Sequence, residues 1–172
     1  YYQFTLKQIE DDIEEGTEEL VALCGEFAGR AVRDEEYLRR LNIPSIYWEW
    51  IATSWQRHDK SLYGRFDLAY DGTSPPKLLE FNADTPTSLY EAAVFQWFWL
   101  EDRIRAGALP KDADQFNSLH DKLIARFKAW PKSALFHMTA FSEELEDRKN
   151  VEYMAECATE AGHRLVLIDI AD

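Results

Sequence analysis

The sequence predicts a mixed α/β fold: a helical N-terminal part, an antiparallel β-hairpin and a parallel βαβ unit. Apolar residues recur at helical spacing through residues 6–31, two alternating segments flank a turn at residues 72–75, and a strand-helix-strand pattern covers residues 133–170. A strand-helix-strand order at this spacing is typical of parallel pairing. The 172 residues, 46% of them hydrophobic, suffice for one compact domain. We therefore expect a single domain over residues 1–172.

The helical part is expected over residues 1–58. Its first helix carries an apolar stripe with acidic residues between the apolar ones, and we expect a bend near Gly16. Pro44 begins a further helix, which contains an aromatic cluster of Tyr47, Trp48, Trp50 and Trp55. Core packing against the hairpin is the simpler explanation of this cluster, and a platform for stacking a ligand is the alternative.

The hairpin and the loop after it occupy residues 61–90. Arg65 and Asp67 are two residues apart, as are Glu80 and Asn82, so each pair points to one side of its strand. A register that places Asp67 opposite Glu80 also places Arg65 opposite Asn82. It gathers an apolar lining suited to a core on the other face: Phe66, Leu68, Leu79 and Phe81. The hairpin is therefore predicted to have one charged face.

Two opposed carboxylates repel each other unless a cation lies between them. Arg65 could be that cation, which would make the face a structural charge cluster. A divalent ion is the alternative, since the side-chain oxygens of Asp67, Glu80 and Asn82 are of the kind that Mg²⁺ accepts. Such an ion implies a nucleotide, and Arg65 would then be suited to stabilising a transferring phosphoryl group.

The segment after Asn82 is predicted to be a loop that leads into a helix. Thr87 or Ser88 is expected as its N-cap, with Glu91 completing a capping box. A helix N-terminus favours anions, so the loop suits a carboxylate or phosphate, although capping alone also explains these residues. Residues 92–100 are expected to form a buried helix that is too short to cross a bilayer.

The α/β part is expected over residues 91–172. It should contain a helix at 113–130, a strand at 133–140, a helix at 144–162 that ends at Gly162, and a strand at 163–170. Cys24 and Cys157 lie in helical patterns without a nearby His in the sequence, and no His has a partner at metal-ligand spacing. Two widely separated cysteines indicate a reducing compartment, and we expect a cytoplasmic protein.

The charge balance bears on partners. Thirty-two acidic and nineteen basic residues give a formal net charge of −13, which argues against nucleic acid or an anionic membrane as a partner. A cationic substrate would be attracted, although general acidity of soluble enzymes also explains the charge. The sequence does not indicate an oligomeric state.

The hairpin and its loop strongly resemble the synthetase domain of the glutathionylspermidine synthases. The likeness runs through YGRFD at residues 63–67, EFNADTPTSL at 80–89 and EAA at 91–93, and it extends over nearly the whole chain. It implies the fold of the part that precedes the ATP-grasp domain in that family. Members are ATP-grasp ligases that join a peptide carboxylate to a polyamine through an acyl-phosphate, so the resemblance implies ATP and Mg²⁺ as cofactors.

The resemblance also implies a role for individual residues. Arg65 corresponds to the catalytic residue that stabilises the transition state, and Arg65, Phe66 and Asp67 to the ATP-binding segment. The magnesium ligands would be Asp67, Glu80 and Asn82. The substrate-binding residues would be Thr85, Thr87, Glu146 and Asp147, with the first two beside the peptide acid and the acidic pair beside an amine.

The sequence departs from the best-known members in two ways. We expect no amidase domain ahead of Tyr1, so the chain is similar to the synthetase-only branch, whose acid and polyamine-like amine need not be glutathione and spermidine. Lysines over the nucleotide phosphates and a subdomain around the adenine are also missing, so we expect a fragment of a larger ligase that is inactive in isolation. A non-catalytic peptide- or polyamine-binding relative and a divalent-metal phosphohydrolase remain as alternatives.

Overall fold

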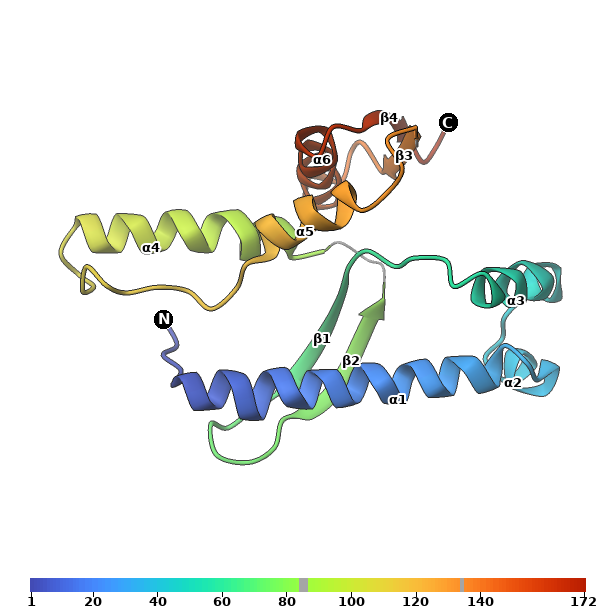
Figure 1. Cartoon of the computed structure of the whole chain (residues 1–172), viewed down its shortest axis with the longest axis horizontal. Helices are drawn as coiled ribbons and strands as arrows, with labels where there is room; N and C mark the ends of the chain where they lie inside the picture. The colour runs from blue at the N-terminus through green and yellow to red at the C-terminus, as the bar shows by residue number, and fades with distance from the viewer. Residues whose placement is uncertain (84–86, 134) are drawn as a thin grey trace. The chain divides into compact units, whose positions relative to one another are not determined.

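The computed structural model describes residues 1–83, 87–133 and 135–172. The chain divides into two compact units: unit 1 comprises Tyr1–Ser61 and Arg65–Ala83, and unit 2 comprises Leu62–Gly64 and Asp84–Asp172. Each unit combines helices with a two-stranded sheet (Figure 1). The predicted mixed α/β class is confirmed.

In unit 1 a long helix packs beside the hairpin. The helix starts with a π-helical segment, η1 (Gln8–Glu14), and continues as α1 (Glu15–Ala31) with helical backbone angles at the junction. The hairpin strands β1 (Gly64–Ala69) and β2 (Lys77–Ala83) pair in antiparallel fashion beside it (Figure 1). A Cβ at Gly16 would lie 3.4 Å from Pro76 Cγ, an ordinary van der Waals distance, so the segment before β2 lies against this part of the helix.

Hydrogen bonds fix the hairpin turn on this helix. Gln8 Nε2 donates to the Gly72 carbonyl oxygen at 2.8 Å, and the Tyr70 hydroxyl donates to the Asp12 carboxylate. Gly72 has φ +84°, a conformation that favours glycine in turns. The turn is therefore held by polar contacts on both of its sides.

Three short helical elements follow α1, namely α2 (Glu35–Arg40), η2 (Ser45–Tyr47) and α3 (Trp48–Gln56). The aromatic cluster was predicted to be core, which is wrong for Tyr47 and Trp50, because these side chains are 46% and 69% exposed. With Trp55 they line an open cleft of ≈ 710 Å³. Trp55 packs on Gly29 of α1, where a Cβ would lie 3.0 Å from its ring. Trp55 therefore packs against α1, whereas Tyr47 and Trp50 remain exposed beside the cleft.

The first helices of unit 2 are a continuous helix made of two segments and a second, shorter helix. The continuous helix consists of the π-helical η3 (Glu91–Phe95) and α4 (Gln96–Arg105). The prediction of a buried helix at 92–100 is wrong in its burial, since Phe98 is 57% exposed, although Leu100 is buried. The second helix, α5 (Leu119–Lys128), starts later than the predicted residue 113. Asp114 Oδ1 accepts a hydrogen bond from the Gln115 amide at 2.8 Å, and such local bonds compete with helix formation.

The remainder of unit 2 is the predicted parallel βαβ unit. It consists of β3 (Leu135–Ala140), α6 (Leu145–Glu160) and β4 (Arg164–Asp169), with Leu135 opposite Arg164 and Ala140 opposite Asp169. Gly162 follows α6 with φ +89°, as a C-terminal glycine stop requires. This part of the prediction is confirmed.

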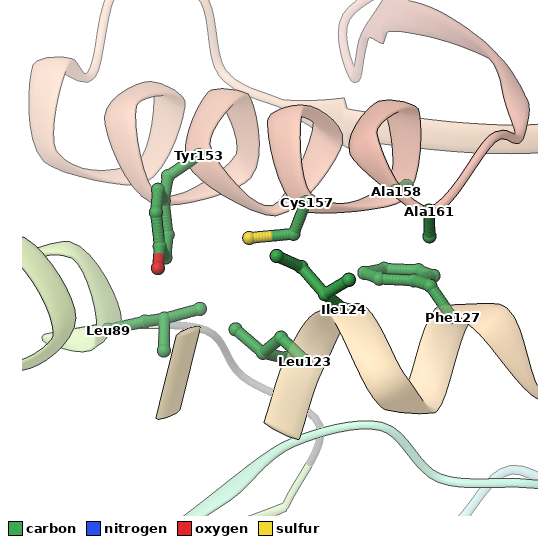
Figure 2. Packing of buried hydrophobic residues seen from close by; sticks show 8 residues of the cluster. All are labelled: Leu89, Leu123, Ile124, Phe127, Tyr153, Cys157, Ala158 and Ala161. Carbon is green, nitrogen blue, oxygen red and sulfur yellow. The ribbon is translucent and has the colours of Figure 1, made fainter. Parts of the chain in front are cut away.

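The core of unit 2 lies between α5 and α6. Figure 2 shows side chains from α6 facing those of α5, with Leu89 beside them. Eight residues form this buried cluster: Leu89, Leu123, Ile124, Phe127, Tyr153, Cys157, Ala158 and Ala161. Across the described ranges of the chain, none of the helices has the length and apolar character that a membrane span needs.

Candidate functional site

The charged face of the hairpin is organised around Arg65. Its Nε donates to Asp67 Oδ1 at 2.7 Å and its Nη2 donates to Asp67 Oδ2 at 3.2 Å, which makes a two-point ion pair. Both side chains are about one-third exposed, at 30% and 35%. The hydrogen bond from Arg65 lowers the pKa of Asp67 below its ordinary value, so this carboxylate stays ionised.

The second strand completes this face through Asn82. In the amide orientation that satisfies both neighbours, Asn82 Oδ1 accepts from Arg65 Nη2 at 3.1 Å and Nδ2 donates to Glu80 Oε1 at 3.1 Å. The four polar side chains therefore form a continuous chain of contacts in the order Asp67, Arg65, Asn82 and Glu80. We name this set the hairpin cluster.

The opposite face of the hairpin carries the aromatic residues. The rings of Phe66 and Phe81 stack with their centroids 4.2 Å apart. The predicted register, with Asp67 opposite Glu80, requires Phe66 to lie opposite Phe81 and Arg65 opposite Asn82. Both of these pairs are in contact. Phe66, predicted to lie in the ATP-binding segment, can therefore meet a ligand on the charged face only through its backbone. Leu79 and Phe81 are 70% and 39% exposed, whereas Phe66 and Leu68 are half-buried, so the lining predicted for a core is only partly covered.

The hairpin cluster has the donor types that a magnesium ion needs. Asp67 and Glu80 contribute carboxylate oxygens, and Asn82 contributes an amide oxygen after rotation of its side chain toward Glu80. In the described part of the chain no three His, Cys, Asp or Glu residues lie close enough to hold a metal, and the cluster itself contains only two carboxylates. The donor set fits Mg²⁺, which commonly takes few protein ligands and keeps water or phosphate on the others.

The predicted substrate residues belong to unit 2. Thr85 lies outside the described residues, and Thr87 is half-buried in the turn before η3. Glu146 is exposed and Asp147 is half-buried, both in the first turn of α6. The structure thus places Thr87 and the acidic pair at the starts of two helices of one unit.

The amides at the start of the helix after the loop have two kinds of partner. The Ala92 amide donates to the Ser88 carbonyl oxygen at 3.1 Å, and Ser88 has φ +61°. The Tyr90 amide donates to Asn150 Oδ1 of α6 at 2.9 Å, a contact that the predicted capping by Thr87 or Ser88 does not include. Within the described residues, Glu91 Oε2 is buried and has no hydrogen-bond partner, so this oxygen forms no capping box there. No local sequence signal identifies Asn150, because it is distant in the chain.

A histidine lies near Cys157, contrary to the expectation from the sequence. His120 Nδ1 is 2.8 Å from the Tyr153 hydroxyl oxygen and 3.9 Å from Cys157 Sγ. Cys157 is fully buried, and this burial raises the pKa of its thiol. The protonated thiol is a poor nucleophile, so the Cys157–His120 contact is a packing feature of the α5–α6 core.

Comparisons with known proteins support one family. A model described as glutathionylspermidine synthase preATP-grasp matches residues 1–172. A Haemophilus influenzae protein described as an acid–amine ligase is 42% identical over 98% of this chain and 43% of its own length. The bifunctional glutathionylspermidine synthetase/amidase of Escherichia coli is 24% identical over 94% of the chain and 26% of its own length. Trypanothione synthetase of Crithidia fasciculata is 35% identical over 44% of the chain and 12% of its own length. The chain therefore spans less than half the length of each of these relatives.

Proposed function

The chain belongs to the glutathionylspermidine synthase preATP-grasp family, and on this premise we propose that it forms part of an ATP-dependent acid–amine ligase. The observation that carries the proposal is the hairpin cluster, in which a two-point Arg65–Asp67 pair adjoins the oxygens of Glu80 and Asn82. A charged set of this composition suits phosphoryl transfer, where negative charge develops on several oxygens at once. We further propose that residues 1–172 act as one domain in the cytoplasm.

The proposed reaction joins a carboxylic acid to an amine in two steps. A carboxylate oxygen of the acid attacks the γ-phosphorus of ATP, ADP leaves, and an acyl-phosphate forms. The amine nitrogen then attacks the acyl carbon, inorganic phosphate leaves, and the nitrogen loses a proton to give the amide. The acid would be a peptide or another small molecule, and the amine would be polyamine-like.

Each residue of the hairpin cluster has a proposed role. Arg65 is the proposed catalytic residue, because its planar guanidinium donates to two oxygens at once and can do so to a phosphoryl group. Asp67, Glu80 and Asn82 would hold Mg²⁺, which when bound neutralises phosphate charge. The backbone at Phe66 would lie beside the nucleotide. Asp67 also orients Arg65 through their shared pair of hydrogen bonds.

The substrate roles are assigned to unit 2. Thr85 and Thr87 are proposed to contact the acid, and Glu146 and Asp147 to attract the amine through their charge. The helix that follows Thr87 presents amide groups that favour an anion. In this arrangement the acid would bind near the N-terminus of η3 and the amine near the N-terminus of α6.

One observation favours a second candidate function. Arg65 balances the charge of Asp67 through a two-point ion pair, so the hairpin cluster could be a stable charge cluster in a non-catalytic peptide- or polyamine-binding relative. A phosphohydrolase built on the same carboxylates is a further outcome to test. The three functions differ in what happens to ATP and to the amine.

The decisive experiment is a magnesium titration of the ligase that contains this chain. Asp67→Asn and Glu80→Gln should each raise the Mg²⁺ concentration for half-maximal amide formation, by about tenfold or more, because each removes an anionic oxygen. Asp59→Asn, which breaks an exposed pair with Arg57, is the control and should leave the curve unchanged. Superimposable curves for all variants would exclude Asp67 and Glu80 as ligands.

The same assay separates the candidate functions. Orthophosphate release that does not depend on the amine would indicate a hydrolase, and amine binding without ATP turnover would indicate a binding protein. The isolated 172-residue chain should form no amide, since neither a glycine-rich phosphate loop nor an ATP-grasp lysine set occurs in its sequence. Amide formation by that chain alone would contradict the proposed location of the ATP site.

A further inference from the structure

Asn150 connects two parts of unit 2 that the proposed function assigns to the substrates. Its side chain is 1% exposed. Oδ1 accepts from the Tyr90 amide at 2.9 Å, and Nδ2 donates to the Glu146 carbonyl oxygen at 2.9 Å. One amide group therefore bonds to the chain just after the loop that contains Thr87 and to the residue that begins the acidic pair.

The surroundings keep this connection rigid. Leu89, which precedes Tyr90, is completely buried in the α5–α6 core, and the Tyr90 ring lies 5.5 Å from the Tyr153 ring of α6. A buried amide with one donor and one acceptor satisfied has little freedom to rotate, because rotation would leave both bonded groups unpaired. The end of the loop and the first turn of α6 are thus held in one arrangement.

A simple capping role does not require this residue. A Ser, Thr or Asp just ahead of the helix could accept a hydrogen bond from a free amide of the first turn. A buried side chain sixty residues away is not needed for that purpose. An amide side chain accepts and donates in one plane without carrying a charge, and Asn has a shorter reach than Gln. Its two hydrogen bonds, one from the Tyr90 amide and one to the Glu146 carbonyl oxygen, distinguish Asn150 from an ordinary cap.

We propose that Asn150 is a positioning residue of the ligase, which fixes the separation between the turn that contains Thr87, proposed to contact the acid, and the first turn of α6, proposed to attract the amine. This inference rests on the proposed function. Two substrates that react with each other must be held within a fraction of an ångström of the productive geometry, and a displacement of about 1 Å can cost about a hundredfold in rate. Asn150 touches neither substrate in this scheme and acts through Tyr90 and Glu146.

Three variants of the complete ligase test the role. Asn150→Ala removes both hydrogen bonds and should lower kcat by about a hundredfold, because the two substrates no longer meet in the productive geometry. It should also raise the KM for the acid and for the amine by about tenfold or more. Asn150→Asp keeps an acceptor for Tyr90 but places a carboxylate against the Glu146 carbonyl, so it should raise the KM for the amine more than the KM for the acid. Ala158→Gly is the matched control, since it loosens the same helix at a fully buried position without touching either bond. It should lower the melting temperature and leave both KM values unchanged.

Hydrogen exchange gives a readout that does not depend on activity. The Tyr90 amide should exchange at least about tenfold faster in Asn150→Ala than in Ala158→Gly, and Asn150→Asp should stay near wild type at this amide. Equal KM values in Asn150→Ala and wild type, or equal effects of Asn150→Ala and Ala158→Gly, would reduce Asn150 to a packing residue and overturn the inference. If Asn150→Ala does not fold, Asn150→Asp and Asn150→Ser supply the same comparison. A wild-type enzyme that forms no amide would instead overturn the proposed function, while the exchange data would still report whether Asn150 holds the loop.

Discussion

Units 1 and 2 hold their candidate site residues by different means. Unit 2 has a continuous apolar core between α5 and α6, with Phe127, Leu89 and Cys157 completely buried (Figure 2). In unit 1 the buried apolar residues, such as Ile9 and Leu38, lie on separate helices and belong to no cluster of the described residues. The substrate elements therefore depend on packing, whereas the hairpin cluster depends on strand pairing and charge.

The difference has a consequence for how each region tolerates change. A packed interior loses stability when any of its side chains is shortened, because a cavity remains. A hairpin held by hydrogen bonds tolerates changes in its apolar residues but is sensitive to loss of a donor or a charge. Substitutions in the two units should therefore differ in the size of their effects.

The largest effect should come from the core of unit 2. Phe127→Ala should destabilise this unit by about 3–5 kcal/mol, because it removes a fully buried ring. Phe81→Ala in the hairpin removes a ring that is 39% exposed and should cost about 1–2 kcal/mol. Hydrogen exchange measured separately for amides of α6 and β1 distinguishes the two losses. Similar losses in both variants would show that unit 1 also has a core, and the contrast would fail.

The next effect concerns charge in the hairpin. In the complete ligase, Arg65→Lys keeps the positive charge but loses the planar group that bonds to Asp67 at two points. Turnover should fall by about a hundredfold, in line with loss of a preorganised donor, while the KM for ATP changes little. Arg57→Lys changes an exposed pair elsewhere in unit 1 and serves as the control. Full activity of the Arg65→Lys variant would assign Arg65 a purely structural role.

The smallest effect is an alkaline transition in unit 1. The hydrogen bond to Asp12 raises the pKa of Tyr70 to about 12, from an ordinary value of 10.0. Between about pH 10 and 12 the unfolded chain loses the phenolic proton before the folded chain does, so the stability contributed by this bond declines as pH rises through that range. Tyr70→Phe should remove this part of the pH dependence. Absorbance titration of the phenolate, compared between wild type and variant, measures it, and ionisation of Tyr70 near pH 10 would contradict the structure.

The sequence contains enough information for the local parts of the fold. Spacing alone predicts that Arg65, Asp67, Glu80 and Asn82 share a face, because side-chain direction in a strand is fixed by a period of two. The parallel pairing of β3 and β4 follows from the strand-helix-strand order. The roles of these residues in catalysis and metal binding stay predictions.

Features that depend on tertiary contacts were not predicted. The exposure of Trp50 and Phe98 differs from the prediction because hydrophobicity indicates which residues could be buried but not which surfaces meet. The cap that Asn150 provides for Tyr90 joins residues sixty positions apart. His120 and Cys157 meet for the same reason, as α5 and α6 pack together and bring distant residues into contact.

The buried position of Cys157 makes this thiol a natural reporter. Cys24 is half-buried on α1 in unit 1, while Cys157 is sealed between α5 and α6 and has a raised thiol pKa. An alkylating reagent should therefore modify Cys24 in the native protein and reach Cys157 only when the two helices separate. Since the cysteines belong to different units, the labelling rate of Cys157 relative to that of Cys24 measures how often unit 2 opens. No engineered cysteine is needed for this measurement.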